Sequence, residues 1–196
     1  MRLFLIVFSG LLFITSCEDP VLSPKPRGFP RVDFPDHAYK DFGKDFCDFD
    51  FEMPVYAQIE QDTLFFEEKP KHPCWFNIYY PQFDSRIHCS YSEADSPEAL
   101  EGLKADAFDL AGKHNVKANY IDELPIQKPD GTTGIVFDME GPVASPFQFY
   151  LTDGKKHFLR GALYFNTQAK PDSLAPVTEF IKADVMQMIN TLTWSN

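Results

Sequence analysis

The sequence is poor in basic residues. Its 18 lysines and arginines stand against 29 aspartates and glutamates, and the formal net charge is −11. Nucleic-acid binding depends on clustered lysine and arginine that neutralise phosphates, so this composition argues against a nucleic-acid partner. The same deficit removes the electrostatic attraction that holds basic surfaces on anionic lipid. Any attachment to a membrane therefore has to come from an anchor.

The sequence also lacks a long apolar run and the motifs that mark common active sites. Its apolar stretch at residues 3–14 is shorter than the roughly 20 residues that a helix needs to span a bilayer. It contains no nucleophile-elbow, zincin, phosphate-loop or dinucleotide-binding motif. Two adjacent pairs, Asp36-His37 and Lys156-His157, combine acid–base groups, but neighbouring residues rarely share a face. We therefore expect no catalytic residues, no metal site and no cofactor.

The N-terminal residues 1–16 have the features of a bacterial lipoprotein signal peptide. Arg2 supplies a positive start, residues 3–14 supply the apolar region, and the stretch Ile14 to Cys17 resembles a lipobox. That resemblance implies cleavage before Cys17 and acyl chains, such as palmitate, on the Cys17 thiol and the new amine. Each buried CH₂ contributes about 0.8 kcal/mol, so two or three chains give stable attachment where one binds reversibly. A secretion signal cut elsewhere is the alternative.

The segment after Cys17 is rich in proline, with five prolines between residues 20 and 35. Proline at this density disfavours helices and sheet ladders, so residues 17–36 are predicted to form the lipid anchor and an extended spacer. A single domain is predicted over residues 37–196. The sharper alternative for the spacer is a strip that docks into a partner, with contact candidates Pro26, Arg27, Phe29, Pro30 and Arg31.

The other three cysteines, Cys47, Cys74 and Cys89, leave one thiol unpaired if a disulfide forms. A protein exported from the reducing cytoplasm permits such a bond. Cys74 and Cys89 flank a predicted hairpin, and a turn near Phe83 and Asp84 would place them about four residues out of register. That offset is too large for a disulfide. Cys47–Cys74 is therefore the preferred pair, and three buried reduced thiols remain the alternative.

Histidines beside two of these cysteines raise the question of zinc. His72 and Cys74 are two residues apart, and His88 precedes Cys89 directly. Because successive side chains of a strand point to opposite faces, His88 and Cys89 cannot both face one metal ion. We therefore expect no zinc at these residues.

The rest of the chain predicts an α+β domain. One helix begins at Pro97, after Ser96 as N-cap, and extends to about His114, and a second covers residues 172–194. A hairpin over residues 145–166 turns at Asp153-Gly154. Further strands are predicted at residues 52–62, 75–80, 87–91, 116–124 and 132–139. Short connections favour a mostly antiparallel sheet of about six or seven strands covered by two helices. This order of elements is similar to that of the Mog1/PsbP-type α/β sandwich.

Four stretches resemble the gliding motility lipoprotein GldD family of Bacteroidota: PKPRGFPRVDFP, PCWFNIYYP, GPVASPFQFYLTDGKKHFLRGALYFN and DSLAPVTEFIKADV. The resemblance covers essentially the whole chain after the signal. It implies a lipoprotein of the cell envelope that faces the periplasm, on either the inner or the outer membrane. It also implies a requirement in gliding and in the associated type IX protein secretion, with other proteins of those systems as partners.

The resemblance carries no known catalytic residues. We therefore expect a non-catalytic component that acts through protein–protein contacts. The alternative is a periplasmic ligand-binding module or enzyme that uses a pocket between sheet and helix.

Overall fold

The computed structural model describes residues 31–43, 45–61 and 72–195, and the structural statements that follow concern these residues. The elements are, in chain order, β1 (Tyr39–Asp41), β2 (Phe49–Asp50), β3 (Glu52–Pro54), β4 (Gln58–Gln61), β5 (Trp75–Tyr80), η2 (Pro81–Phe83), β6 (Ser85–Glu93), α2 (Pro97–Gly112), η3 (Lys113–Val116), β7 (Tyr120–Gln127), β8 (Thr133–Glu140), β9 (Phe147–Thr152), β10 (His157–Phe165), α3 (Pro171–Thr191) and β11 (Thr193–Trp194).

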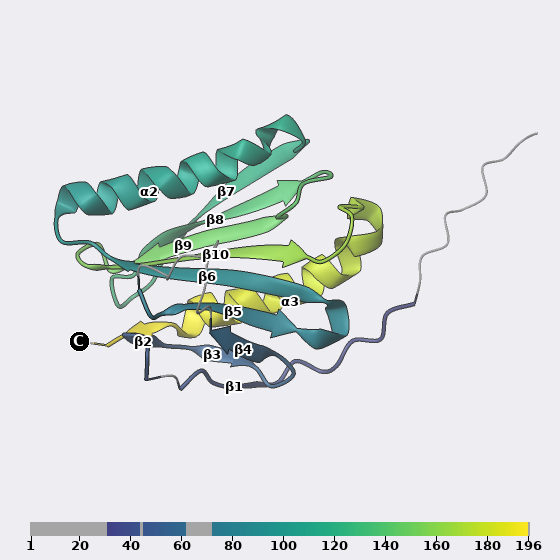
Figure 1. Ribbon diagram of the computed structural model, residues 1–196, viewed down its shortest axis with the longest axis horizontal. Helices are drawn as coiled ribbons and strands as arrows, with labels where there is room; N and C mark the ends of the chain where they lie inside the picture. Colours follow the sequence, from purple (N-terminus) through teal and green to yellow (C-terminus); the bar gives the residue numbers. More distant parts are fainter. Residues whose placement is uncertain (1–30, 44, 62–71, 196) are drawn as a thin grey trace, which may run out of the picture. The chain divides into compact units, whose positions relative to one another are not determined.

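A seven-stranded antiparallel sheet is the centre of the domain (Figure 1). Its strand order is β4-β5-β6-β10-β9-β8-β7, and two small two-stranded sheets, β1-β3 and β11-β2, lie beside it. All of its pairs are antiparallel. The predicted α+β class, with a mostly antiparallel sheet and two helices, is confirmed.

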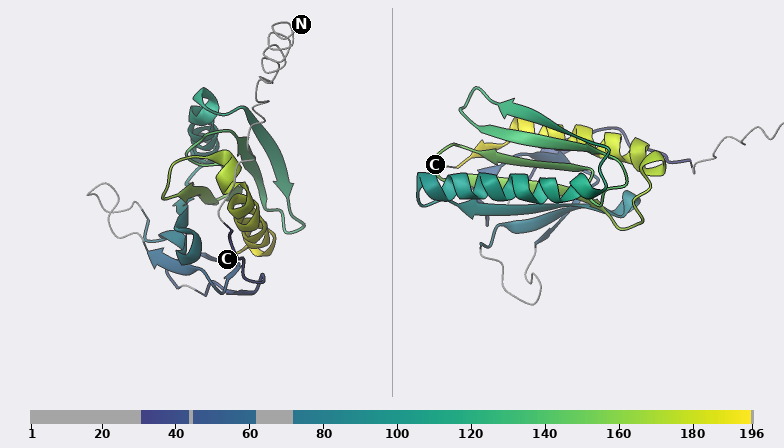
Figure 2. Two further views of the ribbon diagram at one scale, coloured as in Figure 1. Left: turned by 90° about the vertical axis from the view of Figure 1, so that its right-hand side faces the viewer. Right: turned by 90° about the horizontal axis from the view of Figure 1, so that it is seen from above.

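The two helices cover opposite faces of this sheet (Figure 2). On one face Leu100 of α2 belongs to a cluster with Phe137 of β8. On the other face Ile181 of α3 belongs to a larger cluster with Phe149 of β9. Gly161 of β10 leaves room for the ring of Phe149, because a Cβ at Gly161 would lie 2.3 Å from that ring. Alternation along the strands thus gives each helix its own set of core residues.

The hairpin formed by β9 and β10 follows the prediction most closely. Gly154 has a φ of +74°, which suits glycine at this turn. The Asp153 carboxylate accepts backbone N–H bonds from Lys155, Lys156 and His157, each at 2.9 Å. Burial opposes ionisation, but these bonds outweigh it and lower the pKa of Asp153. Short-range chemistry therefore fixes both the position and the register of this hairpin.

The first predicted strand differs from the structure. Residues 52–62 were expected to form one strand, but a turn separates β3 from β4. The N–H of Ala57 donates to the carbonyl of Pro54 at 3.2 Å, and the N–H of Val55 donates to Ala38 at 2.9 Å. β3 therefore pairs with β1, while β4 joins the edge of the large sheet. No helix within the described ranges is long and apolar enough to cross a membrane.

The structure joins Cys47 to Cys74, the pair that the sequence favoured, with 5.0 Å between their Cα atoms. Cys89 is a buried free thiol. It pairs with Phe76 in the sheet, so it is two residues out of register with Cys74, not the four that were predicted. Burial raises the pKa of the Cys89 thiol, which makes it unreactive.

Candidate functional site

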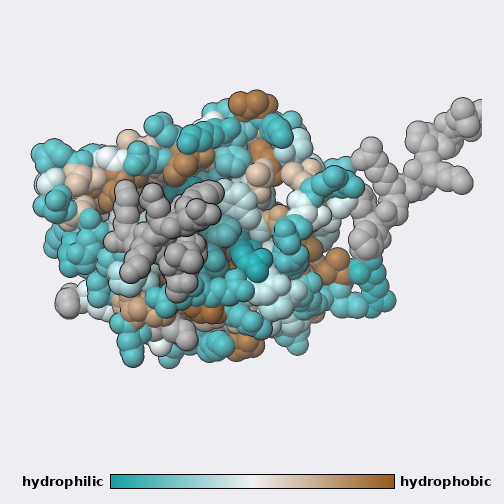
Figure 3. All heavy atoms as spheres, viewed as in Figure 1, coloured by the Kyte–Doolittle hydropathy of each residue, from teal (hydrophilic) through white to brown (hydrophobic). Residues whose placement is uncertain are grey.

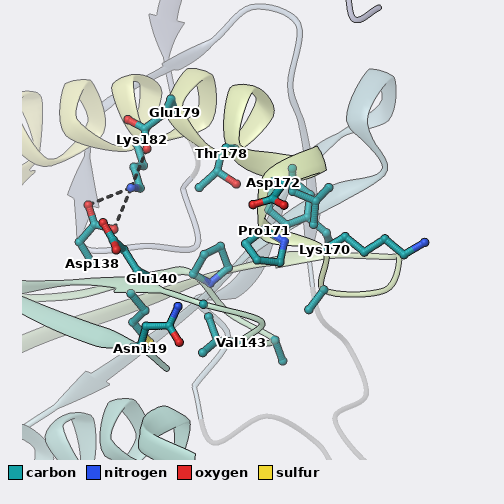
Figure 4. A pocket seen from close by; sticks show the side chains of 18 of the residues that line it. Asn119, Asp138, Glu140, Val143, Lys170, Pro171, Asp172, Thr178, Glu179 and Lys182 are labelled. Carbon is teal, nitrogen blue, oxygen red and sulfur yellow. Dashed lines mark hydrogen bonds and ion pairs between the residues drawn. The ribbon is translucent and has the colours of Figure 1, made fainter. Parts of the chain in front are cut away.

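A pocket of about 680 Å³ lies between the sheet and the first half of α3 (Figure 4). β7 and β8 supply Tyr120, Asp122, Asp138 and Glu140 on the side of the sheet that α3 covers. The β8–β9 loop, the end of β10 and the first three turns of α3 complete the walls. This is the position between sheet and helix that the alternative function required.

The wall made by the β8–β9 loop depends on Gly141. This residue has a φ of +118°, and a Cβ there would lie 2.9 Å from both the nitrogen of Asn119 and the carbonyl oxygen of Lys117. Only glycine combines this backbone conformation with so close an approach. The loop therefore lies directly against the chain that enters β7, and Asn119 and Val143 close this side of the pocket (Figure 4).

Carboxylates dominate the charge of the pocket, with five acids and two lysines in its lining. Lys182 of α3 lies 2.8 Å from carboxylate oxygens of both Asp138 and Glu179 (Figure 4). Burial would lower the pKa of Lys182, but the two carboxylates outweigh it and raise that pKa. The Lys182 ammonium is therefore fixed in an ion-pair network and is unsuited to act as a base at neutral pH.

A second polar cluster surrounds the buried Asp184 of α3, and its other members are only partly buried. Its side chain is 0% exposed, and one of its oxygens lies 2.8 Å from Nδ1 of His37. Tyr39 donates a hydrogen bond to it at 3.0 Å, and Tyr56 donates at 2.8 Å. Burial, reinforced by the contact with Asp184, raises the pKa of Tyr39 to about 12. The pKa of Tyr56 is raised for the same reasons.

The Asp184 cluster ties the chain before β1 to α3. The rings of His37 and Phe34 both stack on the ring of Phe180, with centroid distances of 4.3 Å and 4.9 Å. Gln82 donates to the carbonyl of Asp33 at 2.5 Å. The polar groups of this cluster satisfy one another, which is the arrangement of a structural network. The His37 side chain stays 37% exposed while it pairs with the buried Asp184.

A third group, Asp48, His72 and Glu93, brings three possible metal ligands within 4.8 Å of one another. Nδ1 of His72 accepts the N–H of Cys74 at 3.1 Å, which places the imidazole proton on the other nitrogen. Glu93 is held by Lys156 at 2.9 Å. Two of the three groups thus have partners that a metal would have to displace, and the geometry does not favour a metal here.

Most of the site residues predicted from the sequence fall before residue 31. Cys17 and the contact candidates Pro26, Arg27, Phe29 and Pro30 lie outside the described residues. Arg31 is exposed, with its Nε 3.0 Å from Asp33. Among the described residues, Arg31 does not line the pocket, whose lining the sequence did not predict.

The family model described as "Gliding motility lipoprotein GldD" matches residues 19–194. A comparison with curated proteins found none that matches the chain. The solution structure of cyanobacterial PsbP (CyanoP) from Synechocystis sp. PCC 6803 covers 81% of this chain and 93% of its own, with a TM-score of 0.48 and 8% sequence identity.

Proposed function

The chain belongs to the gliding motility lipoprotein GldD family, and from that premise we propose that it is a lipid-anchored, non-catalytic component of the cell envelope that acts through protein–protein contacts. Family membership implies a role in gliding motility and a location in the envelope. The finer parts of the proposal are the anchor at Cys17, the periplasm-facing domain and the contribution to type IX protein secretion.

The observation that carries this proposal is the family match over residues 19–194. The pairing of Lys182 in the pocket and of Asp184 in its own cluster supports the non-catalytic part. Lys182 is held by Asp138 and Glu179, and the buried Asp184 is held by two tyrosines and a histidine. Groups that satisfy one another are positioned to stabilise a surface. An active site instead leaves its acid, base or nucleophile directed at a substrate.

Complementation of a deletion strain tests the proposal. Loss of the gene is expected to abolish gliding on surfaces and to lower secretion through the type IX system. The wild-type gene should restore both. A chain with Cys17→Ala should appear in the soluble fraction after a carbonate wash. If that variant stays in the membrane fraction, the lipid anchor is wrong. If secretion is normal without the gene, the type IX part is wrong.

The pocket favours a second candidate, a periplasmic ligand-binding module or enzyme. Its volume of about 680 Å³ lies within the range of small-molecule sites. Native mass spectrometry of the protein purified from its own envelope separates the two functions. A constant added mass that is lost on replacing Lys182 with Met would favour the ligand-binding function. Recovery of other gliding proteins with no added mass would favour the first.

A further inference from the structure

The α3-facing side of β7 is only partly covered. Even-numbered residues of β7 and β8 point to that side, as shown by Val136 in the α3 core and by Asp138 in its ion pair with Lys182. Yet Tyr120 is 59% exposed and Leu124 is 44% exposed. Large apolar side chains that share the core-facing side of a strand are normally buried. β7 therefore presents an apolar strip, Tyr120 and Leu124, that the described residues leave open.

The backbone edge of β7 is poorly suited to pairing with another strand. The N–H of Lys128 donates to the carbonyl of Thr132 at 2.8 Å. Because hydrogen-bonded and non-hydrogen-bonded residues alternate along an antiparallel strand, the even-numbered residues of β7 direct their backbone groups to β8. The odd-numbered residues direct their backbone groups outward, and Pro125 is one of them. Because proline has no N–H, it removes a donor from the middle of the open edge. A partner would thus contact the side chains of β7 rather than extend the sheet.

The apolar strip continues into the pocket, since Tyr120 belongs to both and Asp122 lies between Tyr120 and Leu124 on the same face. Asp122 and Glu140 line the pocket and form no ion pair among the residues that the structure describes. Tyr120 also offers an aromatic face of the kind that lysine and arginine cations contact. The surface therefore combines apolar area, an aromatic ring and uncompensated negative charge.

The opposite side of the molecule has a different character. The face drawn in Figure 3 is mainly hydrophilic, and outside its grey atoms the apolar residues are scattered rather than gathered in one patch. With a formal net charge of −11 for the chain, an acidic partner segment would be repelled at the pocket. A segment that carries both basic and apolar side chains fits the strip and the pocket together.

We propose that Tyr120, Leu124 and the adjoining pocket form the docking surface for a partner protein, which inserts a segment bearing lysine or arginine together with apolar side chains. This inference rests on the proposed function, because it names the chemistry of the partner through which the protein acts. The basic side chains lie against Asp122 and Glu140, and the apolar side chains cover Tyr120 and Leu124.

Site-specific photo-crosslinking in living cells tests this inference with the full-length lipoprotein. The probe is p-benzoylphenylalanine, placed at Tyr120 or Leu124, with Val55, which is 48% exposed on another part of the domain, as the control position. Mass spectrometry of the adduct identifies the crosslinked peptide. The expected peptide comes from another protein and has more lysine and arginine than acidic residues. The adduct yield at Val55 should be lower.

A charge variant sharpens the test. Asp122→Asn combined with Glu140→Gln should reduce the adduct yield from Leu124 by about fivefold, the size expected when two surface charge pairs are removed. The matched control, Asp106→Asn with Asp109→Asn, removes two exposed acids from α2 and should leave the yield unchanged. Adducts on acidic segments, adducts only within the chain or on lipid, equal yields at Val55, or no adduct would each overturn the proposal.

A further variant distinguishes a failure of the docking surface from a failure of the proposed function. The variant Tyr120→Ser with Leu124→Ser is returned to the deletion strain, and its amount in the membrane is measured. If gliding is lost without the gene but fully restored by this variant, the docking surface is wrong while the function stands. If deletion leaves gliding intact, the proposed function fails whatever the crosslinks show.

Discussion

Replacing Asp184 with asparagine is expected to lower the free energy of unfolding by about 3–5 kcal/mol. The Asp184 carboxylate is 0% exposed, and its partners are His37 at 2.8 Å, Tyr39 at 3.0 Å and Tyr56 at 2.8 Å. Hydrogen bonds to a charged group contribute about 1.5–3 kcal/mol each. Asparagine keeps one acceptor oxygen but turns an NH₂ group toward donors. Because His37 and Tyr39 both contact Oδ1, and Tyr56 contacts both oxygens, the change removes the charge that strengthens all of these bonds and turns an NH₂ group toward the Tyr56 hydroxyl.

Equilibrium unfolding in urea at pH 7 measures this effect, with the unlipidated chain from residue 18 onward under non-reducing conditions. The matched control is Asp109→Asn on the exposed side of α2, which should change stability by less than about 0.5 kcal/mol. Tyr39→Phe alone and combined with Asp184→Asn completes a double-mutant cycle. A loss below about 1 kcal/mol for Asp184→Asn would refute the reasoning, as would strictly additive effects of the two changes.

Two further predictions concern pH and the disulfide. The pKa of Tyr39 is raised to about 12 in the fold, so the folded state holds this proton more tightly than the unfolded chain, whose tyrosine pKa is about 10. The resulting stabilisation is fully present below pH 10 and is lost as the pH rises toward 12; urea unfolding at several pH values should show a smaller loss for Tyr39→Phe. Reduction of Cys47–Cys74, which are 27 residues apart, should lower the free energy of unfolding by about 2–4 kcal/mol, and a Cys74→Ser chain should not respond to reductant. Identical urea midpoints with and without reductant would contradict the prediction for the disulfide. An equal loss of stability at alkaline pH in the Tyr39→Phe chain would contradict the prediction for Tyr39.

Local signals explain why much of the fold could be predicted from the sequence. Ser96 and Pro97 define the start of α2, and Ser96 accepts the N–H of Ala99 at 3.1 Å as an N-cap should. The β9–β10 hairpin combines period-two alternation with an Asp-Gly turn. In both cases the determining residues are close together in the sequence. The prediction of these two elements therefore did not depend on contacts between residues far apart in the sequence.

The partners in the Asp184 cluster could not be predicted from local sequence signals. Asp184 falls on the apolar stripe of α3, three residues after Ile181, and an acid at such a position signals a buried carboxylate. The signal does not name its partners, because His37 is 147 residues away in the sequence and Tyr56 is 128 residues away. Their meeting depends on how β1 and the β3–β4 turn pack on α3. The pocket has the same origin, since its walls come from separate segments.

β7 shows a mismatch between sequence pattern and burial that bears on function. Its two sides both carry large apolar residues: Ile121 faces the α2 core, while Leu124 and Ile126 face the α3 side. Such two-sided patterning is typical of a strand covered on both faces. Ile121 and Ile126 are half-buried against the two cores, but Leu124 remains 44% exposed and Tyr120 remains 59% exposed. Burial of these two side chains would contribute favourable free energy, which the isolated domain does not gain. A partner that seats on this strip would gain it, and the acids around the strip would select a partner with basic residues.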